Sequence, residues 1–178
     1  MNTTDNRYAK ALFQLSQEKN SLDDVYAALK EIDRMINALA EFREFLVNPL
    51  LSFPERETVL NALFKGKTPD LVLRFLLFVS YKKRINRLKE IIDAFDGLYL
   101  AVHNQTRVVV QTALALNDED KKTIDARLQE KLHQQVLTQW QLTPDIIGGF
   151  RIFAKGLLYD YSFKSQLNNF RQSSTQKV

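Results

Sequence analysis

The sequence contains no cysteine, only two histidines and few glycines. Without cysteine the chain can form neither disulfides nor thiolate metal sites, and it has no cysteine nucleophile. The two histidines, His103 and His133, are far apart in the sequence, and neither has a second histidine at metal-ligand spacing. We therefore expect no metal and no cofactor.

Long apolar runs are also lacking. The densest one, residues 71–79, is interrupted by Arg74 and has about half of the ~20 residues that a membrane span needs. The first ten residues are polar and do not form the apolar core of a secretory signal. The sequence therefore predicts a protein that is not itself inserted in a bilayer.

Glycine-based nucleotide motifs are incomplete. Residues 66–68 read Gly-Lys-Thr, but the position five residues before Gly66 is Asn61 and the preceding pattern is helical, so a plain turn between helices is the prediction. The pair Gly148-Gly149 has no third glycine and precedes a strand pattern, unlike a dinucleotide fingerprint. No motif identifies a catalytic residue, and we expect the chain not to be an enzyme.

What the chain does contain is typical of a folded globular protein. Hydrophobic residues make up 45%, charged residues 26%, and the net charge is only +4. A nucleic-acid-binding protein usually concentrates more positive charge on one face. One basic segment, Lys82 to Lys89, could contact phosphates or an anionic membrane surface, although a solvated loop and helix start is the simpler interpretation.

Helical periodicity dominates the first 104 residues. An amphipathic helix starts near Tyr8, and a second, capped by Ser21 with Asp24 in a capping-box variant, has an apolar stripe that can extend to Leu46. Asn48-Pro49 ends this second helix. Ser52 with Glu55 predicts a further cap, residues 68–70 predict another helix start with Thr68 as the cap, and a long helix follows over residues 85–102. We predict a bundle of about six helices.

The periodicity changes near residue 105. Residues 107–112 form a β-branched strand pattern, Asn117 with Asp120 predicts a helix start, and residues 136–142 alternate as a second strand. We therefore predict an all-helical domain over residues 1–104 and a small mixed α+β domain over residues 105–178.

The end of the chain combines a glycine pair with a tight hairpin. Gly148-Gly149 opens a strand in which Phe150, Ile152 and Ala154 share one face, and Lys155-Gly156 forms the turn to a second strand. Asp160 is the predicted cap of a final helix. This unit alone could be no more than a compact folding motif.

The same unit resembles the C-terminal signature of the delta subunit of F-type ATP synthase, called OSCP in mitochondria: Gly148, Gly149, a hairpin turn with Gly156, and an Asp160-x-Ser162 step. Residues 7–13 (Arg-Tyr-Ala-Lys-Ala-Leu-Phe) are similar to the family's opening helix. Asn48-Pro49 is similar to the family's loop after the second helix, and residues 75–95 are similar to its fifth and sixth helices. Family members often have Gly-Asp in the hairpin turn, where this chain has Lys155-Gly156.

The resemblance implies a non-catalytic stator subunit. Its helical domain would bind the N-terminal helical segments of the alpha subunits of the catalytic head, and its mixed domain would bind the b subunits of the peripheral stalk. Neither nucleic acid nor direct membrane insertion is implied. The complex would lie at the cytoplasmic face of a bacterial inner membrane, or at a plastid or thylakoid membrane.

In this family the groove for the alpha-subunit helix lies between the first and fifth helices. The matching residues here are Tyr8, Ala11, Leu12, Leu15, Leu76 and Val79. Each of them could equally be an ordinary core residue. Two other classes stay open at this point: a helical nucleic-acid-binding protein that uses Lys82 to Lys89, and an enzyme whose site the sequence does not reveal.

Overall fold

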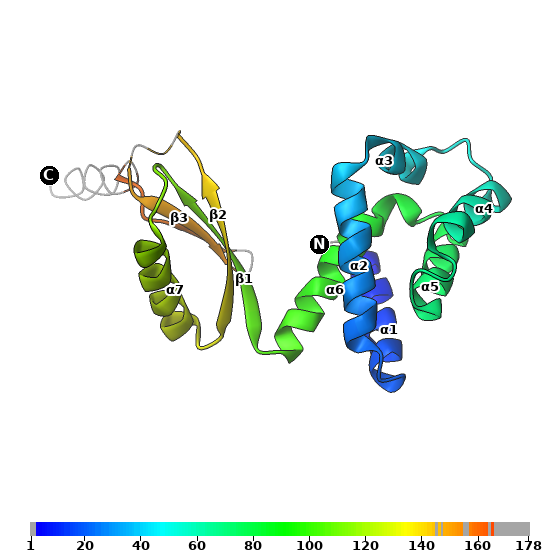
Figure 1. Cartoon of the computed structure of the whole chain (residues 1–178), viewed down its shortest axis with the longest axis horizontal. Helices are drawn as coiled ribbons and strands as arrows, with labels where there is room; N and C mark the ends of the chain where they lie inside the picture. The colour runs from blue at the N-terminus through cyan, green and yellow to red at the C-terminus, as the bar shows by residue number, and fades with distance from the viewer. Residues whose placement is uncertain (1–2, 145, 147, 155–156, 164, 166–178) are drawn as a thin grey trace, which may run out of the picture. The chain divides into compact units, whose positions relative to one another are not determined.

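The computed structural model describes residues 3–144, 146, 148–154, 157–163 and 165. The chain divides into two compact units, Met1–Tyr99 and Leu100–Val178, and the division lies within one helix (Figure 1). Helices make up the first unit, and the described part of the second consists of the end of α6, a sheet and helix α7. This confirms the predicted fold class.

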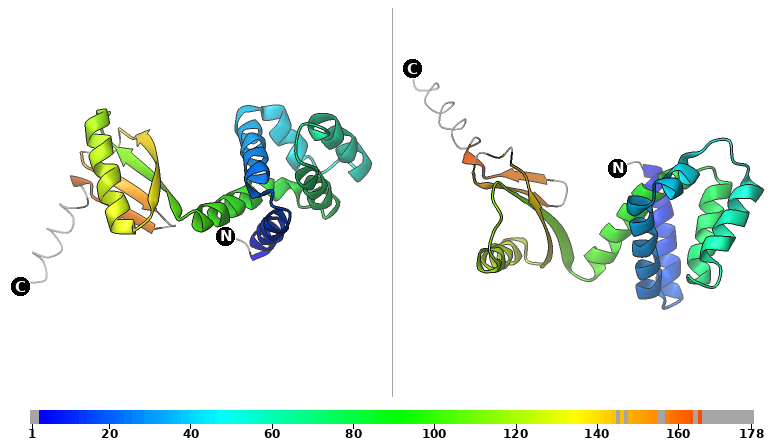
Figure 2. Two further views of the ribbon diagram at one scale, coloured as in Figure 1. Left: turned by 60° about the horizontal axis from the view of Figure 1, so that its bottom comes forward. Right: turned by 45° about the horizontal axis from the view of Figure 1, so that its top comes forward.

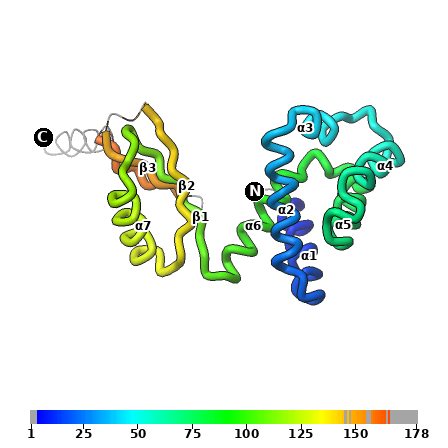
Figure 3. The backbone as a smooth tube through the Cα atoms, viewed as in Figure 1, coloured from blue at the N-terminus to red at the C-terminus, as the bar shows by residue number. Residues whose placement is uncertain are grey.

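The first unit is a helical bundle. Its elements in chain order are α1 (Thr3–Glu18), α2 (Leu22–Ala38), α3 (Ala40–Val47), α4 (Phe53–Phe64), α5 (Asp70–Tyr81), the 3-10 turn η1 (Ile85–Arg87) and α6 (Leu88–Val102), which continues into the second unit. The backbone trace of Figure 3 follows this path.

One apolar cluster holds the bundle together, and every helix from α1 to α6 contributes to it. Phe95 of α6 is fully buried and meets the ring of Phe13 of α1 edge to face at 5.7 Å. Leu12, Ile32 and Leu76 lie in the same cluster. Figure 2 shows α1, α2 and α6 as neighbouring rods of this unit. Burial of these stripes, more than helix propensity, stabilises helices of this length.

The predicted helix ends are partly right. Ser52 and Glu55 form a reciprocal capping box at the start of α4, as expected. Ser21 makes no capping hydrogen bond: its ψ of 23° is not the extended conformation of an N-cap, and its hydroxyl is buried without a partner among the described residues. The second helix does not extend to Leu46, because Leu39 is extended and separates α2 from α3.

The start of α5 lies one residue later than predicted. Pro69 occupies the N-cap position, and α5 begins at Asp70. The Thr68 hydroxyl instead donates to the Phe64 carbonyl oxygen at 3.1 Å, at the end of α4. Gly66 adopts a φ of +74° between the two helices, which is the turn that the sequence predicted there.

The second unit contains a four-stranded sheet with the strand order β2-β1-β3-β4. Its elements are β1 (Gln105–Thr112), α7 (Asp118–Leu132), β2 (Gln135–Leu142), β3 (Phe150–Ala154) and β4 (Leu157–Asp160). Strands β1 and β2 are parallel and joined through α7, whereas β3 is antiparallel to both β1 and β4. The Asn117 side chain accepts the Asp120 N–H at 2.7 Å and caps α7, as predicted.

Helix α7 packs on one face of this sheet. Leu128 of α7 forms a small buried cluster with Val108, Val110 and Ile152 of the strands. Because side chains alternate along a strand, the intervening residues lie on the opposite face of the sheet. Phe153 is one of them and is 39% exposed.

Close backbone approach explains the glycine pair. A Cβ on Gly149, whose φ is +80°, would lie 2.4 Å from the Tyr161 carbonyl oxygen. A Cβ on Gly148 would lie 2.5 Å from the Phe163 ring. The Tyr161 N–H donates to the Phe150 carbonyl oxygen, so the segment after β4 runs against the start of β3. Any other residue at position 149 would push these two segments apart.

The Asp160-x-Ser162 step differs from the prediction in its details. Asp160 is the last residue of β4, and most of the final helix that it was predicted to cap lies outside the described residues. Its carboxylate accepts the Ser162 N–H at 2.9 Å and an Arg151 N–H at 3.1 Å. The cap-type bond is made by the Ser162 hydroxyl, which accepts the Ser165 N–H at 3.3 Å. The turn residues Lys155 and Gly156 lie outside the described residues.

Candidate partner-binding surfaces

Three of the six residues expected in the groove belong to the core of the bundle. Leu12 is 1% exposed, and Leu76 and Val79 are fully buried. They pack inside the apolar cluster of the first unit, so no partner helix can reach them while the bundle stays folded. The expectation that they contact a partner directly is corrected accordingly.

The other three residues lie on one stripe of α1. Tyr8, Ala11 and Leu15 are three and four positions apart, which places them on the same side of the helix. Ala11 and Leu15 are exposed, the latter by 43%, and Tyr8 is half-buried. The Tyr8 ring contacts the ring of Phe78 at 6.1 Å, so this stripe adjoins α5.

Phe78 and Tyr81 extend the surface along α5, and the sequence analysis did not single them out. They are 48% and 62% exposed. On a helix they share a stripe with Asp70 and Arg74, which form an exposed ion pair at 3.9 Å. Aromatic residues in line with exposed charged residues are the signal that could have identified them. We call Tyr8, Ala11, Leu15, Phe78 and Tyr81 the α1/α5 surface.

The cations of the basic segment Lys82 to Lys89 differ in exposure and in their interaction partners. Lys82, Lys83 and Arg84 are exposed. Arg87 donates to Asp5 at 3.0 Å and pairs with Glu90 at 2.9 Å, and the hydrogen bond to Asp5 raises the pKa of Arg87. A run of five cations is therefore not presented to solvent as one patch, which weakens the nucleic-acid alternative.

An ion-pair and hydrogen-bond network joins α2 to α6. Lys89 binds Asp33 at 2.7 Å. Burial alone would lower the pKa of Lys89, but the hydrogen bond to Asp33 and the nearby Asp93 outweigh it and raise that pKa. Burial raises the pKa of Asp93, and the neighbouring carboxylates of Asp33 and Asp96 add to the rise. This network links α2 to α6 within the bundle.

Tyr99 completes this side of the bundle. Its ring stacks on that of Tyr26 at 3.6 Å, with only 2° between the ring planes. Its hydroxyl donates to Asp23 at 2.8 Å. Burial and that hydrogen bond raise the pKa of Tyr99 to about 12. The Tyr26 hydroxyl donates to Asp96 in return. These contacts connect the end of α6 to the start of α2.

The second unit has an exposed sheet face opposite α7. Val109, Phe153 and Leu158 lie side by side across three strands in direct register. Phe153 and Leu158 are 39% and 53% exposed, and Leu137 of β2 is 41% exposed. Arg151 and Asp160 form an ion pair at 3.1 Å beside this row. A row of apolar side chains on an otherwise polar face is typical of a protein-binding surface.

The described residues contain no group of three or more His, Asp or Glu side chains placed to hold a metal ion. No helix among them is long and apolar enough to cross a membrane. His133 is exposed. It ends helix α7 with a left-handed backbone (φ +52°), a conformation in which helices commonly end.

Comparison with known proteins identifies the family. The family model described as ATP synthase delta (OSCP) subunit matches residues 4–173 of this chain. The chain belongs to this family. Two relatives, both named ATP synthase subunit delta, are each 32% identical. The Clostridium kluyveri protein matches over 94% of this chain and 93% of its own length, and the Symbiobacterium thermophilum protein over 93% and 89%.

Solved structures agree on the fold of this delta-type chain. A chain in the Toxoplasma gondii mitochondrial ATP synthase hexamer aligns over 99% of this chain and 100% of its own length, with a TM-score of 0.84 and 24% identity. A chain in a Polytomella F-ATP synthase structure aligns over 57% of this chain and 90% of its own length, with a TM-score of 0.53 and 18% identity. The likeness therefore extends across both units.

Proposed function

We propose that this delta-family chain is the non-catalytic stator subunit that links the alpha subunits of the catalytic head to the b subunits of the peripheral stalk. The observation that carries the proposal is the family match over residues 4–173, which spans both units. A stator must hold the head against the torque of the rotor, so that proton-driven rotation leads to ATP synthesis. Two separate binding surfaces on one chain meet that requirement.

In the first unit, the α1/α5 surface is the proposed contact with the N-terminal helix of an alpha subunit. Tyr8, Ala11 and Leu15 on α1 and Phe78 on α5 present apolar atoms at helical spacing. Such a surface suits the apolar stripe of an amphipathic helix. The buried residues Leu12 and Leu76 support this surface from beneath and set its shape.

In the second unit, the row of Val109, Phe153 and Leu158 on the open sheet face is the proposed contact with the C-terminal ends of the b subunits. Removing these side chains from water would stabilise a complex by roughly 25 cal/mol for each Å² of apolar surface buried. Two moderate contacts on one chain hold tightly, because the second partner binds at a high effective concentration.

The proposed location follows from the partners. Both relatives described above are bacterial proteins. We propose that the chain associates peripherally with the cytoplasmic face of a bacterial inner membrane, through the ATP synthase to which it belongs. A plastid or thylakoid membrane would present the same partners.

The test is a calorimetric titration of the purified chain with a peptide of the alpha subunit's N-terminal helix, at low and at high salt. We expect binding that persists at high salt, because the contact is apolar. Leu15→Asp and Phe78→Asp should each weaken binding at least tenfold. Leu12→Asp is unsuitable as a probe, because Leu12 is a core residue and the variant would unfold the bundle.

A matched control comes from the same unit. Leu39 is 45% exposed, close to the 43% of Leu15, and it lies between α2 and α3. Leu39→Asp should bind the peptide as tightly as the unaltered chain. Equal affinity of the Leu15→Asp, Phe78→Asp and Leu39→Asp variants would contradict the proposed surface.

A further inference from the structure

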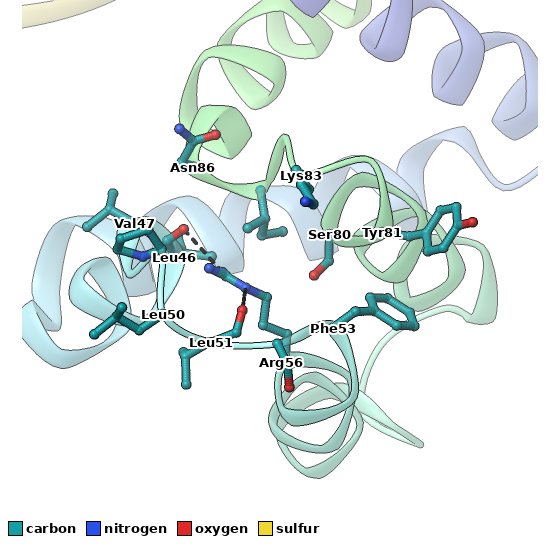
Figure 4. Close-up of a pocket in the computed structure, with 13 residues that line it drawn as sticks. Leu46, Val47, Leu50, Leu51, Phe53, Arg56, Ser80, Tyr81, Lys83 and Asn86 are labelled. Carbon is teal, nitrogen blue, oxygen red and sulfur yellow. Dashed lines mark hydrogen bonds between the residues drawn. The ribbon is translucent and has the colours of Figure 1, made fainter.

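A hollow of the first unit lies between the end of α3, the start of α4 and the loop after α5, and Tyr81 of the α1/α5 surface is one of its lining residues. It has a volume of about 520 Å³, within the range of small-ligand sites. Leu46, Leu50, Leu51 and Phe53 supply apolar wall, and Ser80 and Lys83 supply polar groups (Figure 4).

A buried guanidinium forms part of this wall. Arg56 is only 9% exposed. Its N–H groups donate to the backbone carbonyl oxygens of Leu51 at 3.3 Å, Phe45 at 3.2 Å, Leu46 at 3.4 Å and Asn48. These bonds use four of the five N–H donors of an arginine side chain. They fix the loop before α4 and leave one donor without an acceptor among the described residues.

The charge of Arg56 is not balanced by a counter-ion within the described part of the chain. Among those residues, no carboxylate pairs with Arg56, and the residues that line the hollow include Lys83 but neither aspartate nor glutamate. The partners of Arg56 among the described residues are neutral: backbone carbonyls and the Phe45 ring, whose centroid lies 5.9 Å from the guanidinium carbon. A buried charge with neutral partners alone is under-compensated in a low-dielectric site. The hollow is therefore electropositive.

Ser80 adds an unused donor. Its hydroxyl is buried and makes no hydrogen bond in the part of the chain that the structure describes. A helical serine can bond the carbonyl four residues before it, but this one does not. Figure 4 shows its oxygen directed into the hollow, toward Arg56 and Phe53. A buried polar group without a partner is costly, so this position favours an acceptor supplied from outside.

We infer that this hollow binds a carboxylate that carries a short apolar chain. The Ser80 hydroxyl and Arg56 would donate to the carboxylate oxygens, Lys83 would add charge at the rim, and Leu50 and Phe53 would cover the apolar chain. Charge-assisted hydrogen bonds of this kind are about twice as strong as neutral ones. The inference does not depend on the proposed stator function.

The test is calorimetry and amide chemical-shift mapping on the full chain with 4-methylpentanoate, and with the neutral 4-methylpentanamide of the same shape. We expect the carboxylate to bind at least tenfold more tightly and to shift the amides of Ser80 and Leu50. The peptide acetyl-Leu-Glu-amide distinguishes the source: tighter binding than 4-methylpentanoate identifies an acidic peptide side chain, and weaker binding identifies a free small acid.

Variants separate binding from folding. Ser80→Ala should weaken carboxylate binding about fivefold without lowering the melting temperature, because the hydroxyl makes no bond to the described residues of the free chain. Lys83→Gln should weaken it about threefold, whereas Lys67→Gln, on the exposed turn between α4 and α5, should have no effect. Absence of binding by both acids, equal binding of acid and amide, or unchanged affinity in Ser80→Ala would overturn the inference.

Discussion

Among the described residues, the two units of this chain bury apolar side chains to very different extents. The bundle has one cluster to which all six helices contribute, and rings such as Phe13 and Phe95 lie inside it. The described core of the mixed unit consists of Val108, Val110, Leu128, Ile152 and Ala154. Small domains bury a smaller fraction of their surface and are correspondingly less stable. We therefore expect the bundle to be stable by itself and the mixed unit to gain much of its stability from a partner.

Two spectroscopic signals make this difference measurable in one sample. Trp140 is the only tryptophan and lies in β2, so its fluorescence reports on the mixed unit. Circular dichroism at 222 nm reports chiefly on the helices of the bundle. In urea the Trp140 transition should precede the helical one. Coincident transitions would show that the two units unfold as one.

The largest expected effect is that of Phe95→Ala. The ring is fully buried against Phe13, so its loss should reduce the free energy of unfolding of the bundle by about 3–5 kcal/mol. The helical transition should move to lower urea concentration, and the Trp140 transition should not. Phe153→Ala, at a ring that is 39% exposed, should change either transition by less than about 1 kcal/mol.

A pair of glycine variants tests the mixed unit in the same way. Gly149→Ala should cost about 3 kcal/mol, because its Cβ would lie 2.4 Å from a backbone oxygen at a φ of +80°. Gly66→Ala in the bundle has a similar φ of +74° but no atom within 4 Å, and should cost only about 1 kcal/mol. If both variants lost the same stability, the close approach of the Tyr161 carbonyl oxygen would not be the reason for glycine at position 149.

Alkaline pH should weaken the bundle through Tyr99. Its pKa is raised from 10.0 to about 12, so the stability from the protonated phenol is complete below pH 10 and is lost as the pH rises to about 12. The loss should be about 1 kcal/mol, because the group is partly exposed. Absorbance at 295 nm should show a late-titrating phase that Tyr99→Phe removes.

The smallest expected effect is a gain in the stability of the bundle. Gly97 lies in α6 and is exposed, and a Cβ added at this position would meet no atom within 4 Å. Gly97→Ala should raise the stability of the bundle by about 0.5–1 kcal/mol, because alanine loses less backbone entropy in a helix. A loss of stability, measured by the helical transition in urea, would indicate that Gly97 serves a contact beyond the bundle.

Local signals in the sequence predicted most of the fold. Ser52 with Glu55, Asn117 with Asp120, and the alternation over residues 150–154 each depend on near neighbours, and the structure confirms them. The break at Leu39 was not predicted, because neither glycine nor proline marks it. Both α2 and α3 place residues in the common core, a tertiary feature that no local pattern encodes.

The candidate surface was harder to predict than the fold. Helix α5 is apolar on several sides, and periodicity alone does not distinguish a stripe that faces the core from one that faces a partner. Leu76 and Val79 proved to be core residues, while Phe78 is exposed. The distinction depends on how α1 packs beside α5, which is a tertiary contact that no local pattern encodes.

The most direct test of the stator account asks whether one chain holds both partners at once. In sedimentation velocity, a fluorescent peptide of the alpha subunit's N-terminal helix would be mixed with the full chain and a soluble b-subunit domain. We predict that the label moves as a ternary complex, and that Leu15→Asp releases the peptide while Phe153→Asp releases the b domain. Mutually exclusive binding of peptide and b domain would contradict the account.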